Sequence, residues 1–199
     1  MTELHPSEVD PVEAESYRIL RSRADLSGLP PLTRAVVERI IYETADFGYL
    51  TDLVFGEATL AAGVSALRRG ARVVADGGMV AAAITGYPVI CKVNDSLAER
   101  LARTAGLTVS AAAVRLGFGE AGPGAIWVAG SAPTAVAEIM RRQVDPALVI
   151  GVPAGFVGAV EAKQALRDSG LPAVSNVSER GGPVVAAAVF NALLGAARA

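Results

Sequence analysis

The 199-residue chain contains a single histidine, His5, and a single cysteine, Cys91. A structural zinc site takes about four nitrogen or sulfur ligands, so one copy of this chain cannot supply such a site. A disulfide within the chain is excluded because it would need a second cysteine. We do not expect His5 to fold back from the polar start of the chain into a Ser-His-Asp triad. We expect Cys91 to pack as a small hydrophobic residue in a strand at 89–93.

Charge of one sign is not in excess either. Lysine and arginine total 18 against 20 aspartate and glutamate residues, for a net charge of -2, and like charges do not form runs. Nucleic-acid binding needs a basic patch, so we expect no nucleic-acid partner. No uncharged run reaches the roughly 18 residues that a membrane span needs. The acidic start of the chain lacks an apolar signal core, which predicts a cytoplasmic protein without a membrane partner.

Aromatic residues are also scarce, at 5% of a chain that is 52% hydrophobic. A core of alanine, valine, isoleucine and leucine suits parallel strands covered on both sides. Strand and helix patterns alternate along the chain. They predict an α/β fold, with a mostly parallel sheet, helices on both faces and N-terminal helices before it. We expect residues 1–12 to be a polar leader and residues 13–199 to be a single domain. The predicted strands are 72–75, 89–93, 125–129, 147–152 and 173–177, and the main predicted helices are 12–26, 33–44, 58–67, 79–84, 97–103, 135–142, 157–167 and 184–194.

Glycine- and proline-containing turns directly follow three of the predicted strands. They read Gly130-Ser131-Ala132-Pro133-Thr134, Gly151-Val152-Pro153-Ala154-Gly155 and Ser178-Glu179-Arg180-Gly181-Gly182-Pro183. Ligands of open α/β sheets bind at the carboxyl ends of the strands, where the following helices present free N–H groups. We therefore expect Ser131, Thr134 and the backbone of residues 151–158 to form a pocket floor that favours anionic groups. Ordinary turns without a ligand are the alternative.

These three turns, in this order, resemble those of the precorrin-8X methylmutase family. Two further segments match it, Asp76-Gly77-Gly78-Met79-Val80 with Ile84-Thr85, and Glu15-Ser16-Tyr17-Arg18-Ile19-Leu20. The resemblance covers roughly residues 13–194. It implies a homodimeric isomerase, without a cofactor or metal, whose small-molecule substrate is a tetrapyrrole of cobalamin biosynthesis. Such an enzyme moves a methyl group from C11 to C12 of the macrocycle.

The sequence departs from the family at the position of its proposed proton donor. The family has histidine where this chain has Tyr42, in the segment Arg39-Ile40-Ile41-Tyr42. A phenol has a reference pKa near 10 against about 6.5 for imidazole, so it gives up a proton at a cost about 5 kcal/mol higher. Tyr42 is the predicted catalytic residue, as a proton or hydrogen-bond donor. The alternative is an aromatic packing residue.

A second departure places Val109 where the family has an arginine that meets substrate carboxylates. Losing such a contact, worth about 1.5 to 3 kcal/mol, lowers affinity roughly 10- to 100-fold. The ligand then has fewer carboxylates at that edge, or the pocket is more apolar. Arg115 replaces the arginine only if its helix turns it toward the site. Thr108 and Ser110 remain as hydroxyl donors, or as helix caps.

Three carboxylates, Glu43, Asp46 and Asp52, follow Tyr42 and are predicted either to group near it or to be solvated charges at a helix end. Arg180 is the predicted cation for a carboxylate of the ligand. Tyr17 and Arg18 are expected to close the pocket, from the partner subunit if the chain is a dimer. The predicted substrate-binding residues are Tyr17, Arg18, Asp76, Thr85, Thr108, Ser110, Ser131, Thr134, Gly151, Gly155, Arg180 and Gly181.

Two other functions fit the same residues. One is a diverged enzyme that rearranges or cyclises a smaller metabolite, such as another organic acid. The other is a tetrapyrrole-binding protein without catalysis. Tyr42 and Val109 motivate both.

Overall fold

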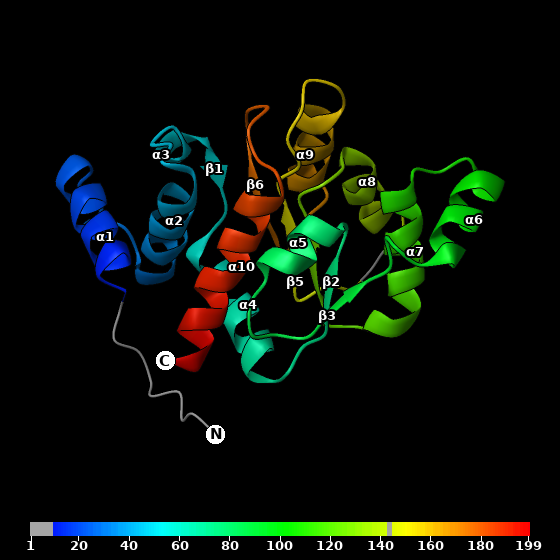
Figure 1. Ribbon diagram of the computed structural model, residues 1–199, viewed down its shortest axis with the longest axis horizontal. Helices are drawn as coiled ribbons and strands as arrows, with labels where there is room; N and C mark the ends of the chain where they lie inside the picture. Colours follow the sequence, from blue (N-terminus) through cyan, green and yellow to red (C-terminus); the bar gives the residue numbers. More distant parts are fainter. Residues whose placement is uncertain (1–9, 143–144) are drawn as a thin grey trace.

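The computed structural model describes residues 10–142 and 145–199, and a sheet lies at its centre (Figure 1). His5 and most of the predicted leader lie outside the described residues. The strands are β1 (Leu53–Val54), β2 (Val73–Ala75), β3 (Val89–Cys91), β4 (Ile126–Ala129), β5 (Leu148–Gly151) and β6 (Ala173–Asn176). The helices are α1 (Pro11–Arg23), α2 (Pro31–Thr44), α3 (Tyr49–Asp52), α4 (Glu57–Arg68), α5 (Gly78–Ala83), α6 (Ser96–Ala105), α7 (Val109–Ala121), α8 (Pro133–Arg141), α9 (Ala159–Asp168) and α10 (Pro183–Arg198).

The sheet has six strands in the order β1-β6-β5-β4-β2-β3. Only β1, at one edge, is antiparallel to its neighbour; β2 to β6 pair in parallel. Successive residues of a strand point to opposite faces. Val73 and Ala75 pack on the side of α4, α5 and α10, whereas Val74 packs on the side of α7, α8 and α9. The predicted α/β fold with a mostly parallel sheet and helices on both faces is therefore confirmed.

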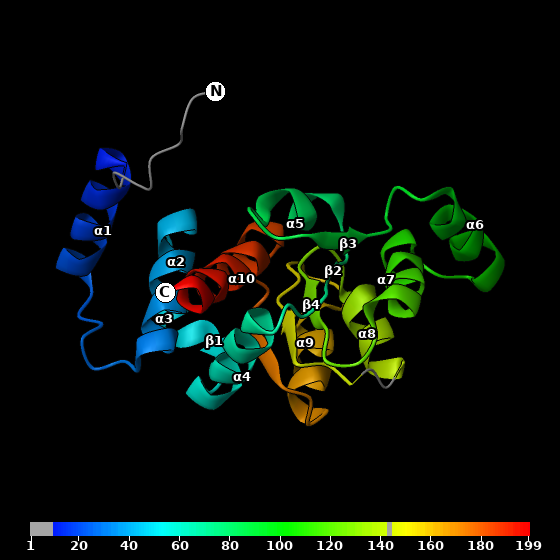
Figure 2. The same ribbon diagram turned by 90° about the horizontal axis from the view of Figure 1, so that it is seen from below.

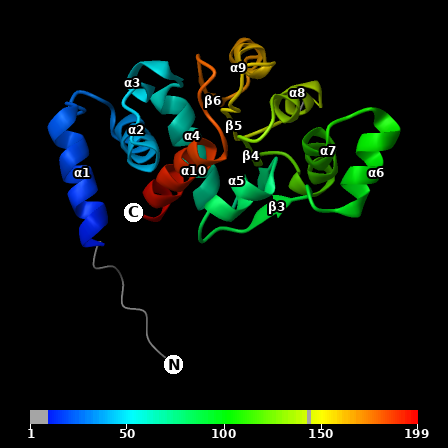
Figure 3. The ribbon, with the colours of Figure 1, turned by 45° about the horizontal axis from the view of Figure 1, so that its top comes forward.

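The outer helices extend the molecule at both ends. Figures 2 and 3 show α1 beside α2 at one end and α6 beside α7 at the other. The apolar helix α10 separates α2 from the sheet and buries Val185, Phe190 and Leu193 almost completely. Cys91 packs partly buried against the same core, as expected. In the part of the chain that the structure describes, no helix combines the length and hydropathy of a membrane span.

Two short elements between α2 and α4 were not predicted, α3 and β1. They span four and two residues, too few for a periodic pattern to show. The pairing of Leu53 with Asn176 and of Val54 with Ser175 brings the end of α3 against the end of β6. Asp52 is thereby buried beside the turn that follows β6, where it contributes to the site described below.

A buried ion-pair group joins α7 to α8 on the other face. The Glu138 side chain is fully buried and pairs with Arg115 at 2.7 Å, with Arg142 at 3.1 Å and with Arg141. Burial opposes ionisation of this carboxyl group, but the three arginines outweigh it and lower the pKa of Glu138 from 4.5 to about 2. The folded state therefore favours the carboxylate. Its stabilisation is complete above about pH 4.5 and is lost as the pH falls toward 2.

We predict that Glu138→Gln lowers the free energy of unfolding at pH 7 by about 2 to 3 kcal/mol, because three cations lose their common partner. The difference from the wild type should shrink between pH 4.5 and 2, where Glu138 itself becomes protonated. Urea unfolding at several pH values measures both effects. The exposed Glu161→Gln is the matched control. Equal stability of Glu138→Gln and the wild type at pH 7 would contradict the analysis.

Candidate active site

The turns at the carboxyl ends of β2, β4, β5 and β6 touch one another and form one continuous surface. A side chain at Gly77 would collide with Ser131, and one at Gly181 would collide with the Val152 carbonyl group. A Cβ atom at Gly130 would lie 2.8 Å from the carbonyl oxygen of Gly182. The glycines therefore allow the backbones to approach closely. We call this surface, made of residues 76–78, 130–134, 151–158 and 177–182, the site floor.

Asp76 fixes one side of the site floor from below. Its side chain, in a residue only 1% exposed, accepts hydrogen bonds from the N–H groups of Gly130, Ser131 and Ala132 at 3.2, 2.8 and 3.0 Å. Burial raises the pKa of Asp76, and the three N–H donors act in the opposite direction. We predicted that Asp76 binds substrate. The structure instead directs its carboxyl group into the loop, so that Asp76 shapes the turn carrying Ser131.

The beginnings of α7 and α8 meet at a pair of threonines. The hydroxyl groups of Thr108 and Thr134 are hydrogen-bonded at 2.7 Å. Thr108 also caps α7 by accepting from the N–H of Ala111 at 3.2 Å. A cavity of about 330 Å³ lies here, lined by both threonines and by Arg141 among others. The two helix starts therefore bring the hydroxyl groups of Thr108 and Thr134 to one place, and Thr108 also has the capping role that was its alternative.

Val109 and Ser110 form the first turn of α7 beside this threonine pair. Val109 is 37% exposed, so an apolar side chain occupies the surface where the family has its arginine. Arg115 does not replace that arginine, because it is paired with the buried Glu138. This edge of the floor therefore carries the apolar Val109, and the Arg115 cation is engaged elsewhere.

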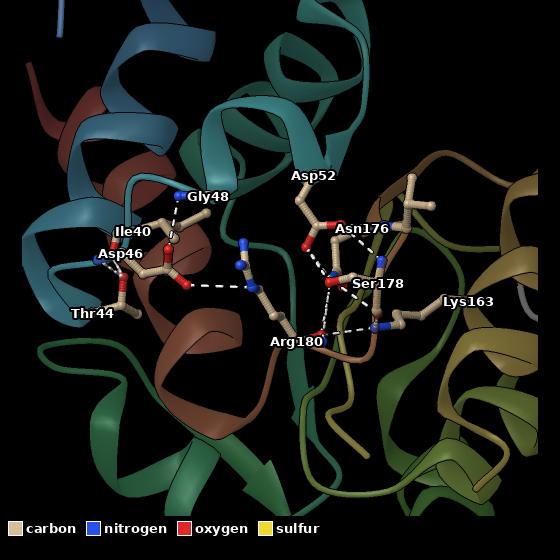
Figure 4. A network of polar contacts seen from close by, with 10 residues as sticks. Ile40, Thr44, Asp46, Gly48, Asp52, Lys163, Asn176, Ser178 and Arg180 are labelled. Carbon is tan, nitrogen blue, oxygen red and sulfur yellow. Dashed lines mark hydrogen bonds and ion pairs between the residues drawn. The ribbon is translucent and has the colours of Figure 1, made fainter. Parts of the chain in front are cut away.

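Arg180 reaches across the other side of the site floor toward the end of α2 (Figure 4). Its Nε lies 3.4 Å from Oδ2 of Asp46, and 48% of its side chain is exposed. The following glycines, with φ values of 140° and 112°, adopt backbone conformations that other residues rarely adopt. Gly182 donates to the Val152 carbonyl at 2.7 Å, and Gly155 donates to the Glu179 carbonyl at 3.0 Å. Arg180, Gly181 and the turn with Gly151 and Gly155 are thus brought together.

Tyr42 lies on the side of α2 that faces α1. Its ring stacks on that of Tyr17, with centroids 5.0 Å apart and planes inclined by 7°. The Arg39 guanidinium group lies 5.2 Å from the centre of the Tyr42 ring. A groove of about 200 Å³ between the two helices is lined by Tyr42, Ser16 and Phe47 among others. Arg18, one residue after Tyr17, pairs with Glu15 at 2.6 Å on the surface.

Thr85 does not join these residues. It follows α5 and precedes β3, so it lies at the amino end of β3, opposite the site floor. The neighbouring Tyr87 donates its hydroxyl to the carbonyl of Ala71, just before β2 begins. The structure therefore places Thr85 apart from the site floor, because α5 carries the chain from the carboxyl end of β2 back toward the amino end of β3 before Thr85 is reached.

The three carboxylates after Tyr42 separate instead of forming a group. Glu43 pairs with Arg39 at 2.6 Å, and Asp46 pairs with Arg180. Asp52 is 7% exposed and is hydrogen-bonded to Asn176 and Ser178. In residues 10–142 and 145–199, no three histidine, cysteine, aspartate or glutamate side chains gather as a metal site.

Sequence reasoning missed Lys163, which is fully buried on α9. It donates to the backbone carbonyls of Ser178 and of Arg180, the latter at 2.8 Å. A signal was present, because Lys163 stands in step with the buried Ala159 and Leu166 on the apolar face of α9. A lysine at such a position indicates a buried acceptor.

Glycines 117, 119 and 122 have the spacing Gly-x-Gly-x-x-Gly that is typical of dinucleotide-binding turns. Such a turn follows a strand and opens a helix. Here the first two glycines lie inside α7 and the third ends it. The segment therefore lacks the backbone context of a dinucleotide-binding turn.

Comparison with known proteins gives one family. Residues 11–196 match the family model described as Precorrin-8X methylmutase. The Cobalt-precorrin-8 methylmutase of Salmonella typhimurium is 37% identical over 195 residues, covering 92% of this chain and 93% of the relative. The Precorrin-8X methylmutase of Pseudomonas aeruginosa is 36% identical over 191 residues, covering 90% and 91% of the two chains.

Solved structures agree. The precorrin-8x methyl mutase from Thermus thermophilus superposes with a TM-score of 0.83 at 33% identity, covering 94% of this chain and 95% of that chain. A second structure, described as a precorrin-8X methylmutase related protein, gives a TM-score of 0.80 at 27% identity, with 88% and 97% covered. This chain belongs to the precorrin-8X methylmutase family.

Proposed function

We propose that this chain is an isomerase of cobalamin biosynthesis that moves a methyl group from C11 to C12 of precorrin-8X or cobalt-precorrin-8. The match of residues 11–196 to one family, with relatives covered over nine-tenths of their length, is the observation that carries this proposal. The reaction is intramolecular, so the protein has to fix the geometry of the macrocycle and supply a proton or hydrogen bond. The alternatives, a smaller metabolite or a carrier, have no comparable support.

The surface around the site floor suits a macrocycle with an apolar ring and carboxylate side chains. Large apolar side chains are exposed at the carboxyl edge, with Phe156 at 93%, Val157 at 90% and Met79 at 70%. Such exposure on a soluble fold indicates a surface that becomes covered by a ligand or partner. Arg180 and the threonine pair supply polar contacts for carboxylates. The floor thus offers apolar area for the ring and separate groups for its substituents.

Tyr42 is proposed as the proton or hydrogen-bond donor where the family has histidine. Stacking on Tyr17 restricts the ring to one orientation, and the Arg39 guanidinium group packs 5.2 Å from the centre of the ring. Tyr17 is therefore a positioning residue for Tyr42. Ser131, Thr134, Thr108 and Ser110 remain proposed contacts of the substrate.

We also propose a cytoplasmic homodimer. The outermost helix α1 packs mainly on α2, and it exposes Val12 at 72% and Ile19 at 36%. Unpartnered apolar side chains on a terminal helix favour burial against a second copy. Tyr17 and Arg18 lie on the same helix α1 and remain proposed to close the pocket of a partner subunit.

We predict that the wild type converts precorrin-8X or cobalt-precorrin-8. Tyr42→Phe should lower kcat by about 100-fold, because the phenyl ring keeps the stack but has no hydroxyl group that can donate a proton. Tyr42→His should have a kcat equal to or higher than that of the wild type. Absorption spectra and product analysis measure the conversion. Tyr87→Phe, which removes a hydroxyl at the opposite sheet edge, is the matched control.

The outcomes separate the hypotheses. Unchanged turnover in Tyr42→Phe would make Tyr42 a packing residue. Tight binding of the tetrapyrrole with turnover only in Tyr42→His would favour a carrier. Absence of binding by every variant would rule out the tetrapyrrole.

We predict that Arg180→Gln weakens tetrapyrrole binding about 10- to 100-fold, because a charged hydrogen bond to a carboxylate is lost. Arg103→Gln, at an exposed position near the end of α6, serves as the control. Titration followed by absorbance gives both dissociation constants. Equal affinity of Arg180→Gln and the wild type would remove Arg180 from the substrate contacts.

We predict that the protein sediments as a dimer at twice the chain mass of 20.3 kDa. Replacing both Val12 and Ile19 by serine should shift it toward the monomer, because their apolar surface would no longer favour the contact. A wild-type monomer at micromolar concentration would contradict the proposed assembly.

A further inference from the structure

Two buried charged residues, Lys163 and Asp52, hold the segment 177–182 from beneath. Neither is among the residues proposed above to contact the substrate. Lys163, from α9, is fully buried and bonds only to the carbonyl groups of Ser178 and Arg180 among the described atoms. Burial lowers the pKa of this amine to about 8. A methionine of similar length would fill the same space without a desolvation cost, so a buried lysine here points to a need for its hydrogen bonds.

Asp52 holds the same segment from the side of β1. Its carboxylate accepts from the N–H groups of Val177 and Ser178 at 3.1 and 2.7 Å. It also accepts from the Ser178 hydroxyl at 2.8 Å and from the Asn176 amide at 2.9 Å. Four donors converge on one carboxylate, which leaves the turn after β6 little freedom.

These contacts fix the backbone of Arg180 at both of its polar groups (Figure 4). Its carbonyl accepts from Lys163 and from Asn176, each at 2.8 Å. Its N–H donates to the Ser178 hydroxyl at 3.2 Å. With the backbone held, the guanidinium group extends away from the buried pair toward Asp46, as the figure shows.

Asp46 connects Arg180 to the end of α2. Its Oδ1 accepts from the N–H of Gly48 at 2.7 Å, and its own N–H donates to the Thr44 hydroxyl at 3.2 Å. Thr44 in turn donates to the carbonyl of Ile40 at 2.8 Å. Tyr42 lies between these last two residues in the chain. A continuous series of contacts therefore links the buried charges to the helix turn that carries Tyr42.

We infer that Lys163 and Asp52 are positioning residues that hold the 177–182 segment so that Arg180 is placed between the site floor and the end of α2. This inference rests on the proposed function for its effect on substrate. Neither residue contacts the substrate, because both are buried under the segment they hold. Loss of Lys163 removes the charged donor from the carbonyls of Ser178 and Arg180 and leaves both to the single Asn176 amide, at 3.4 and 2.8 Å. The segment must then shift to regain the lost hydrogen bonds.

The first test is a double-mutant cycle on tetrapyrrole affinity. Lys163→Met should weaken binding about 10-fold, and Arg180→Gln at least as much. The double variant should bind about as weakly as Arg180→Gln alone, since Lys163 acts through Arg180. Fully additive losses would overturn the inference, as would unchanged affinity in Lys163→Met. The control is Lys92→Met, which removes the other of the two lysines of the chain.

The second test needs no substrate, so it stands even if the proposed function fails. In amide NMR spectra of the full chain, Lys163→Met should shift the signals of residues 178–182 and also that of Gly48, at the end of α2. Lys92→Met should shift neither. A folded Lys163→Met protein with an unchanged Gly48 signal would overturn the inference. Absence of tetrapyrrole binding by the wild type would overturn the proposed function alone.

A milder variant covers the case in which Lys163→Met does not fold. Ser178→Ala removes the hydroxyl that joins Asp52 to the N–H of Arg180 and keeps both buried charges. It should shift the Gly48 signal and weaken tetrapyrrole binding about threefold, with no further loss when combined with Arg180→Gln. An unchanged Gly48 signal in Ser178→Ala would contradict the inference.

Discussion

Parallel pairing of β2 to β6 is the constraint on which the rest of this structure depends. The carboxyl ends of these strands all lie on the same side of the sheet, so the turns after β2, β4, β5 and β6 must share one surface. Close packing of those turns is possible because glycines stand where one backbone meets another. The position of the site follows from this pairing and does not require any single side chain.

The turns themselves are shaped by charged groups beneath them. Asp76 holds the turn after β4, while Asp52 and Lys163 hold the turn after β6. Each buried charge is surrounded by backbone partners of opposite polarity, which offsets the cost of removing it from water. The exposed groups of the floor can therefore be few and mostly apolar, because the rigidity comes from below. This arrangement agrees with a site whose task is to fix a large ligand.

Tyr42 and Val109 are the two positions at which we expect a departure from the family pattern, and the structure gives them different surroundings. Tyr42 has an aromatic partner, Tyr17, and a neighbouring cation, Arg39. Val109 has no replacement cation, because the arginine closest in sequence, Arg115, pairs with Glu138. Tyr42 thus presents a hydroxyl group on a ring of fixed orientation, whereas Val109 presents an apolar side chain at one edge of the floor. Both are compatible with the same ring chemistry and a different set of carboxylate contacts.

The sequence by itself determined the five parallel strands, most helices and the turns that form the floor, because hydrophobic periodicity and glycine positions are local signals. It also determined the family, through motifs whose order is preserved. Tertiary structure alone decided which polar residues act together. Asp52 and Lys163 come from segments more than 100 residues apart, and Asp52 is placed by β1, a strand of two residues with no pattern of its own. Thr85 belongs to a matching motif but lies at the amino ends of the strands, opposite the site floor, because α5 returns the chain along the sheet after β2. Local patterns specify elements, whereas contacts between distant elements depend on how the sheet is ordered, and no single segment contains that information.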